Sequence, residues 1–519
     1  MKRLLYAILS FLVVVVVLSL ILVIFYPFKL KGVKKEESEK IIKSGIRVSV
    51  DLPSKAKTGE VVDYRIIVEN TGVFDLNVTV RDSLGFEWTG FLAAGKFKEF
   101  YNSFEARIAG VLKNEVEAVG RYNDRIVKSS VFDEILVEAT RYSLIDAGDQ
   151  GLITFEPRGT GMFMGKSIEL KIESEINFEI EVEVEPGWIL LSSGPGQNMI
   201  VAETSIIRLK PQVEVEVKIV AYCLDMYKDA PSADETFAIQ QFPEPYSSDV
   251  QKLMKCVDKA PKGRKTLKAV QIALWVVLEN VSKRDIRIFP PPSDSDICNA
   301  IWLLKNSGLK VEDYELYREM IKEVKERPDL PVEIYYNIVF KDGKAFVYGE
   351  VENLGDLAIE GIRIKIVLFD KNGSVTWLST IHPFGYVLYP GEKTSFEYLI
   401  QIDLLGIDPS DVYCDAWVFS ISKALLENYY REFQLSNITV LTEDDSMTVE
   451  GIVENAGLFE AKYVVIVISV YDSAENLVGC GFYYISHMDV DQDKRFKIFV
   501  RLWGVADHWD IRVESRKAS

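Results

Sequence analysis

Apolar and polar residues alternate along most of the chain. Runs such as 46–52 (IRVSVDL), 61–70 (VVDYRIIVEN) and 76–82 (LNVTVRD) place apolar side chains at every second position and end at Gly, Pro, Asn or Asp. This period is typical of strands that bury one face and are separated by turns. The pattern predicts a mainly β protein, with several immunoglobulin-like sandwiches in tandem.

A five-residue pattern, V-E-N-x-G, ends three of these runs. After the last two copies the hydrophobic run closes in Asp at the same interval from the Asn, at Asp370 and at Asp472. Equal spacing predicts a tandem pair of sandwiches. Asn and Gly both tolerate left-handed turns, so we interpret the motif as a folding signal without chemistry. The copies lie at 68–72, 351–355 and 453–457.

One stretch between the sandwiches changes to a helical period. Val250, Leu253, Met254 and Val257 lie three or four positions apart, after a Ser-Ser-Asp start that suits a helix N-terminus. Similar patterns follow, and one of them stops at Gly308. A helical insert in a β protein is where we expect a functional site. The expected helices cover about 250–257, 266–279, 296–305 and 311–325.

The N-terminus carries a long apolar run at 4–28 without a charged residue. At about 1.5 Å per residue it can cross a hydrocarbon core of about 30 Å, and it lacks the small-residue cleavage site of a signal peptide. The run predicts a single uncleaved transmembrane helix. Basic residues after it argue for a cytosolic C-terminal side. The sandwich domains, with four glycosylation sequons, argue for an extracytoplasmic one. The sequon residues are Asn77, Asn280, Asn372 and Asn437.

These patterns together divide the chain into six parts. The expected parts are a transmembrane anchor at 1–32, a charged linker at 33–44, a sandwich at 45–142, a sandwich plus helical module at 143–331, and sandwich repeats at 332–410 and 435–519.

Composition removes several classes of function. A net charge of −18 argues against a nucleic-acid partner, because phosphate binding needs a basic face. The three histidines are widely scattered, so no metal site rich in histidine is expected, and no cofactor motif is present. Five cysteines without C-x-x-C spacing leave at least one thiol unpaired.

Two short blocks carry the sharpest chemical hypothesis: YCLD at 222–225 and VQIALW at 270–275. The segment 158–275 resembles the thioester-domain family of surface adhesins, where Cys lies between an aromatic and an apolar-Asp pair and Gln in a T-Q-x-A-φ-W block. The resemblance implies an internal thioester, an acyl group that a nucleophile on a partner attacks to form a covalent link. The thioester candidates are Cys223 and Gln271, with Tyr222, Asp225 and Trp275 as supporting residues.

Other interpretations of the two residues stay open. Cys223 would also suit a buried thiol, or a disulfide with Cys256 or Cys298 in an oxidising exterior. Gln271 would also suit a hydrogen bond to a neighbouring element. The last two sandwiches resemble small extracytoplasmic domains of the FxLYD and CARDB kinds, which serve as spacers or binding surfaces.

The expected function is that of a single-pass cell-membrane protein with its bulk outside the cytoplasm. It would not be an enzyme, and it would act in surface attachment to, or binding of, a protein or glycan partner, through the thioester if that forms. The alternative is a structural or accessory subunit of an envelope assembly without covalent chemistry.

Overall fold

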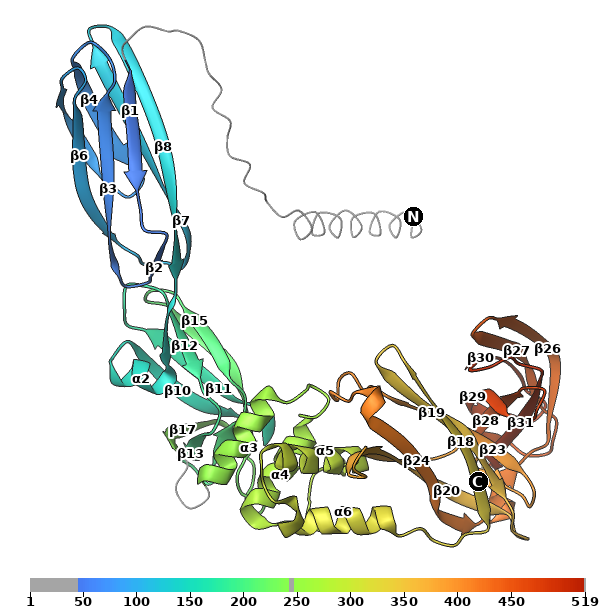
Figure 1. Cartoon of the computed structure of the whole chain (residues 1–519). Coiled ribbons are helices and arrows are strands. Elements are labelled where there is room, and N and C mark those ends of the chain that lie inside the picture. The colour runs from blue at the N-terminus through green and yellow to red at the C-terminus, as the bar shows by residue number, and fades with distance from the viewer. Residues whose placement is uncertain (1–44, 242–246, 518–519) are drawn as a thin grey trace. The chain divides into compact units, whose positions relative to one another are not determined.

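The computed structural model describes residues 45–241 and 247–517. The expected anchor at 1–32 and linker at 33–44 lie outside the described residues. Within the described residues, no helix has both the length and the apolar character to cross a membrane. The chain falls into two compact units, the first holding most of the first sandwich and the second the remainder. The fold is mainly β, as the alternation predicts (Figure 1).

The first sandwich packs two sheets around an aliphatic core. Alternation buries every second residue of β3, including Ile66 and Val68, against Val78 and Val80 of β4. One sheet has the order β1–β3–β6, and the other β2–β8–β7–β4–β5. The strands are β1 Ile46–Asp51, β2 Lys55–Lys57, β3 Val61–Asn70, β4 Leu76–Asp82, β5 Glu87–Leu92, β6 Phe97–Glu105, β7 Gly110–Tyr122 and β8 Arg125–Glu138.

The second domain contains a closed six-stranded sheet with the order β10–β11–β16–β14–β13–β17. A three-stranded sheet, β15–β12–β9, and the short helix α2 complete it. Ile168, Leu170 and Ile172 of β11 point into its core. The elements are β9 Thr140–Ser143, α2 Leu144–Asp149, β10 Ile153–Thr160, β11 Met164–Ser174, β12 Ile180–Val184, β13 Trp188–Ser192, β14 Met199–Val201, β15 Ser205–Leu209, β16 Glu214–Cys223 and β17 Ala233–Gln241.

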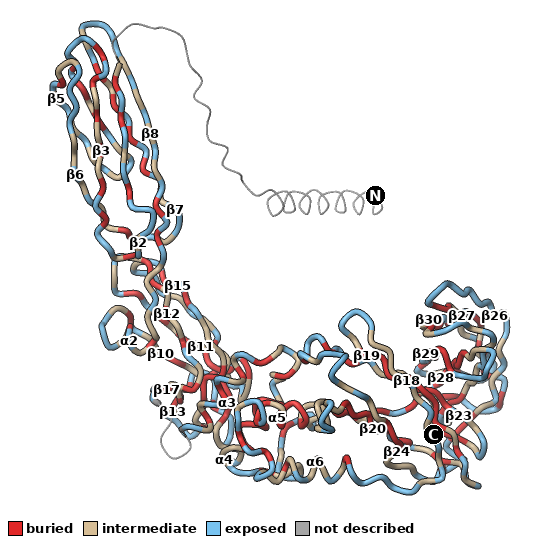
Figure 2. The backbone as a smooth tube through the Cα atoms, in the orientation of Figure 1, coloured by how far each residue is buried: buried red, intermediate tan, exposed pale blue. Residues whose placement is uncertain are grey.

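All four expected helices are confirmed. Thr266 caps the N-terminus of α4, Asn280 ends it in a left-handed conformation, and Ser293 starts α5 with a capping box. Buried positions run along α4 and α5 (Figure 2), and one core joins the helices to Tyr222 on one side and Val367 on the other. The helices are α3 Ser247–Lys259, α4 Leu267–Glu279, α5 Asp294–Asn306 and α6 Glu315–Lys325, with η1 at Val311–Asp313.

The last two sandwiches follow, with boundaries that differ from those expected. β24 pairs with β20 and so extends the third sandwich beyond residue 410. The sheets are β18–β19–β23 with β21–β20–β22 and β24, then β25–β31–β28–β29 with β26–β27–β30. The strands are β18 Val332–Lys341, β19 Lys344–Asn353, β20 Ile359–Asp370, β21 Val375–Ile381, β22 Val387–Leu388, β23 Lys393–Ile400, β24 Val412–Lys423, β25 Tyr429–Tyr430, β26 Phe433–Glu443, β27 Ser446–Asn455, β28 Ala461–Tyr471, β29 Leu477–Met488, β30 Asp493–Arg501 and β31 His508–Lys517, with η2 Pro409–Asp411 and η3 Leu426–Asn428.

The Asn of the V-E-N-x-G motif has a structural role, but the predicted reason is wrong. The Asn residues are fully buried and are not left-handed. Each side-chain amide donates to the carbonyl four residues later and to a carbonyl on another strand or loop. The amide therefore ties two chain segments together and satisfies carbonyls that would otherwise be buried without a partner. The three are Asn70, Asn353 and Asn455.

An aspartate repeats in the same way. Asp370 accepts hydrogen bonds from the backbone N–H groups two and four residues later, and Asp472 does the same. Asp82 makes identical bonds in the first sandwich, to Leu84 and Phe86. The first sandwich is therefore a third copy of the repeat. The sequence obscures this because β4 is shorter than β20.

Charged side chains fix the junction between the third and fourth sandwiches. Arg431 donates to Glu392 Oε1 and to Glu514 Oε2, each at 2.8 Å, and Glu514 is fully buried. The Tyr471 hydroxyl donates to Glu350 at 2.6 Å across the same junction. Bonds of this kind restrict rotation between the two sandwiches.

Candidate functional site

The structure brings Cys223 and Gln271 together although 48 residues separate them. Cys223 ends β16 of the closed sheet, and Gln271 lies in the first half of α4. Both are fully buried. Helix α4 is buried on all sides from Ala269 to Val276, whereas Leu267 at its start is exposed.

The carboxamide of Gln271 pairs with the backbone of Cys223. Its Oε1 accepts from the Cys223 N–H at 3.1 Å, and its Nε2 donates to the Cys223 carbonyl at 2.7 Å. Both ends of the buried amide are thus satisfied, which removes a desolvation cost of about 1–3 kcal/mol per group. This pairing docks α4 on the end of β16.

The thiol of Cys223 points into the core of the closed sheet, where Sγ lies 3.2 Å from Met199 Sδ. Burial raises the pKa of this thiol far above its ordinary value, and the charge of Asp225 adds to the effect. The thiol is therefore a weak nucleophile here, since the thiolate is the reactive form. All five cysteines are free thiols in the structure, so of the alternatives for Cys223 the structure has the buried thiol and not a disulfide with Cys256 or Cys298.

The expected supporting residues lie around the pair without contacting the carboxamide through hydrogen bonds. Tyr222 and Trp275 belong to the helical core. Asp225 accepts from the Tyr227 N–H at 2.9 Å and pairs with Lys228 at 3.4 Å, so it shapes the turn after β16. The four sequon residues are exposed: Asn77, Asn280, Asn372 and Asn437.

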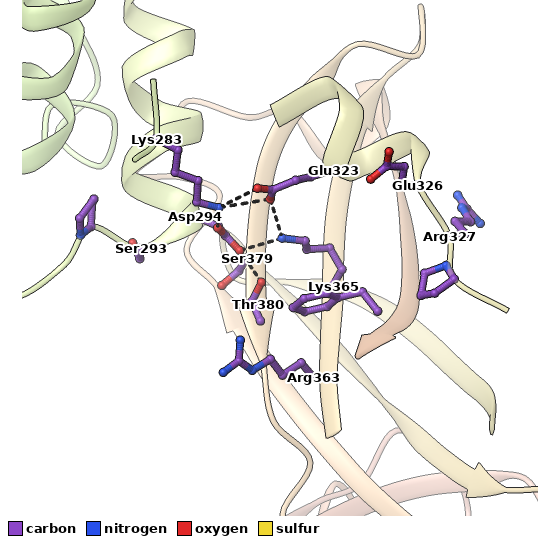
Figure 3. Close-up of a pocket in the computed structure, with 13 residues that line it drawn as sticks. Lys283, Ser293, Asp294, Glu323, Glu326, Arg327, Arg363, Lys365, Ser379 and Thr380 are labelled. Atoms are coloured by element: carbon purple, nitrogen blue, oxygen red, sulfur yellow. Dashed lines mark hydrogen bonds and ion pairs between the residues drawn. The ribbon is translucent and has the colours of Figure 1, made fainter. Parts of the chain in front are cut away.

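A pocket of about 880 Å³ lies where the helical module meets the third sandwich (Figure 3). Asp294 at the start of α5 and Glu323 on α6 face Lys365 of β20. Lys365 Nζ lies 3.0 Å from Asp294 and 3.3 Å from Glu323, and Lys283 reaches both carboxylates as well. These ion pairs hold two walls of the pocket at a fixed separation.

Electrostatics within the pocket favour the charged forms. Burial alone would raise the pKa of Asp294, but the Thr380 hydroxyl and the charges of Lys365 and Lys283 outweigh it and lower the pKa from 3.8 to about 2. Lys365 is almost fully buried and also lies 4.7 Å from the centre of the Phe419 ring.

One cation in the pocket has no partner among the described residues: Arg363, next to Lys365 on β20, makes no ion pair or hydrogen bond there. Arg327 lines the pocket too, but its guanidinium pairs with Asp415 and lies over Trp417. A free guanidinium at the edge of a fixed cavity suits a carboxylate or another planar anion. Nothing in the sequence marks these residues, because R-I-K at 363–365 has the alternation of an ordinary strand.

The comparisons with known proteins give little guidance. No protein-family model matches the chain, and no curated protein matches it. The CARDB domain of PF1109 from Pyrococcus furiosus is 17% identical in a solution NMR structure and in a crystal structure with di-metal ions. These cover 19% and 20% of this chain and 97% and 95% of that domain, with TM-scores of 0.16.

A larger match is native alpha-2-macroglobulin from Escherichia coli, from domain MG7 to the C-terminus. It is 10% identical, covers 92% of this chain and 98% of that one, and has a TM-score of 0.17. Values this low carry no argument about function. The repeated β domains described above rest on the strands and hydrogen bonds of this chain alone.

Proposed function

We propose that the chain is a non-catalytic, membrane-tethered extracytoplasmic protein that binds an acidic group of a surface partner. The observation that carries the proposal is the pocket beside α5 and α6, whose walls are held by the Lys365 ion pairs and which leaves Arg363 free. A cavity with fixed walls needs little reorganisation on binding, so little affinity is lost to ordering. The apolar run at 4–28 supports the membrane tether.

The fixed junctions support the same proposal. The helical core is continuous with the closed sheet and with the third sandwich, and Arg431 ties the third sandwich to the fourth. Such junctions hold a binding surface at a defined place. An envelope subunit would use them equally well, and stoichiometric co-purification of a membrane partner would favour that alternative.

The Arg363→Glu variant tests the binding site. The full chain is reconstituted in liposomes and sedimented with envelope fragments of its own source. We expect the variant to bind about tenfold more weakly, because a charge-assisted hydrogen bond contributes about 1.5–3 kcal/mol. The matched control is Arg284→Glu, since Arg284 is exposed and does not line the pocket. Equal binding by wild type and Arg363→Glu contradicts the proposal.

Protease added to intact cells tests the topology separately. Cleavage of the sandwich domains supports the extracytoplasmic location, and complete protection in cells whose membrane is intact contradicts it.

A second candidate is an internal thioester that links the partner covalently. It is supported by the two hydrogen bonds that hold the Gln271 carboxamide against the backbone of Cys223, where both residues are fully buried. The sulfur would bond to Gln271 Cδ, and the amide nitrogen would leave with the thiol proton as ammonia. Intact-mass measurement of freshly purified protein decides it. The thioester requires a deficit of one ammonia that Cys223→Ala and Gln271→Ala each restore, and full mass in the wild type excludes it.

A further inference from the structure

The buried amide of Asn455 brings two segments of the fourth sandwich together. It donates to the carbonyl of Phe459 at 2.9 Å and to the carbonyl of Asp489 at 3.0 Å. Phe459 directly precedes Glu460, and Asp489 follows the end of β29. Side chains from the loop before β28 and from the end of β29 therefore meet at one place on the surface.

Three ligating side chains lie at this place: Glu460, His487 and Asp489. Each offers one oxygen or nitrogen atom, and these atoms all lie within 4.8 Å of one another. His487 Nε2 is 3.0 Å from Asp489 Oδ1. Glu460 and Asp489 are exposed and His487 is half-buried, so an ion from solvent can reach all three.

The backbone that carries two of these residues is held from both sides. The Asp489 N–H donates to Gln492 Oε1 at 3.2 Å, and Lys494 Nζ donates to the His487 carbonyl at 2.5 Å. Together with the Asn455 bonds, these contacts fix the main chain beneath the side chains. A site whose supporting bonds already exist loses less entropy when an ion binds.

The third sandwich provides an internal comparison. Asn353 makes equivalent bonds there, to the carbonyls of Leu357 and Leu388. Leu388 corresponds to Met488, whose carbonyl also accepts from Asn455, at 3.4 Å. The positions that correspond to the three ligating residues hold Ala358, Val387 and Tyr389, without a carboxylate or an imidazole. The repeat thus supplies the geometry in both sandwiches, and only the fourth sandwich carries metal-binding side chains on it.

We propose that Glu460, His487 and Asp489 bind one divalent transition-metal ion of the zinc, cobalt or nickel class. An imidazole with two carboxylates suits these metals, whereas calcium and magnesium prefer sites made of oxygen alone. Three protein ligands leave a coordination position for water or for a side chain of another molecule. The site is independent of the pocket at Arg363.

Calorimetric titration of the full chain with zinc and with cobalt tests the proposal. We expect one ion per chain, with affinity about tenfold or more lower in His487→Ala and about tenfold lower in Glu460→Gln and Asp489→Asn. Without metal, each variant must have the same melting temperature as the wild type, which shows that it is folded. If His487→Ala does not fold, the affinity of the isosteric variant Glu460→Gln is used to test the site. Absence of binding in the wild type, or undiminished binding in the folded variants, overturns the proposal.

His508 supplies the matched control. It also lies between two carboxylates, but Glu475 faces Nε2 and Asp507 faces Nδ1, each at 3.4 Å. One ion cannot bind all three groups across the ring, so His508→Ala should leave the affinity unchanged. The absorption spectrum of the cobalt-bound protein shows whether a cysteine binds the ion instead. A strong sulfur-to-metal charge-transfer band would mean that a cysteine is a ligand and would overturn the proposal.

Discussion

The free energy of unfolding of the Arg264→Met variant is expected to be about 2–4 kcal/mol lower than that of the wild type. Arg264 is almost fully buried between α3 and α4. Its guanidinium donates to the Thr376 carbonyl at 2.7 Å, to Asn299 Oδ1 at 3.0 Å and to the Leu405 carbonyl at 3.1 Å. It therefore joins the helical module to the third sandwich.

Two opposing effects determine whether Arg264→Met raises or lowers the free energy of unfolding. Burial lowers the pKa of Arg264 from 12.5 to about 10, which shows that the charge is costly where it lies, and Met would remove that cost. Met would also remove the donor from three acceptors, two of them in buried bonds, and a buried acceptor without a donor costs about 1–3 kcal/mol. The cost of the acceptors left without a donor exceeds the gain from removing one buried charge. The flexible Met side chain fills most of the volume of Arg264, so the net effect is the loss of these bonds, which destabilises the protein.

Denaturant unfolding measured with a probe in the helical module checks this result. Arg284→Met is the control, because Arg284 is exposed and a substitution there should stay within about 0.5 kcal/mol. Amide exchange in α5 should accelerate in Arg264→Met and stay unchanged in the control. A variant as stable as the wild type would show that the buried charge costs as much as its bonds contribute.

The sequence was sufficient for the local structure but not for these long-range bonds. The four helices follow from apolar spacing and from caps such as Ser293, which are local signals. The role of Asn353 could not be inferred, because its amide bonds Leu388, a residue that only the folded chain brings near. The sequence suggested a left-handed turn as the reason for Asn at this position, whereas the actual reason is the hydrogen bond to a distant carbonyl.

The candidate sites show the same division. The resemblance to thioester domains implied a bond between the Cys223 thiol and the Gln271 side chain, whereas the bonds in the structure join the carboxamide to the cysteine backbone. Lys365 was missed because its position in β20 alternates like a solvent-facing residue. The helical module covers that face of the strand, so the lysine is buried. Burial of a strand residue by another module cannot be predicted from the sequence of that strand alone.

Replacing Lys365 by Met is expected to destabilise the protein by about 2–4 kcal/mol at pH 7, since it leaves Asp294 and Glu323 near one another with only Lys283 between them. The loss should also depend on pH. The folded-state pKa of Asp294 is about 2, below the ordinary 3.8, so its ionised form stabilises the native state.

The direction of this dependence follows from the lowered pKa. The contribution of Asp294 is fully present above pH 3.8 and is lost as the pH falls through about 2. At about 1.4 kcal/mol per pKa unit, this lowering of the pKa from 3.8 to about 2 amounts to about 2–3 kcal/mol. Lys365→Met removes one of the charges that lower the pKa, so the stability difference from the wild type should be large at pH 5–7 and shrink toward pH 2.

Urea unfolding of both proteins at a series of pH values measures this difference. The control is Lys371→Met, because the Lys371 and Asp411 side chains are 67% and 56% exposed and such pairs contribute about 0–1 kcal/mol. Carbon chemical shifts of the Asp294 carboxyl group, followed during an acid titration, should give a higher pKa in Lys365→Met. A stability difference that stays constant from pH 7 to pH 2 would mean that Lys365 acts through packing on Phe419 and not through its charge.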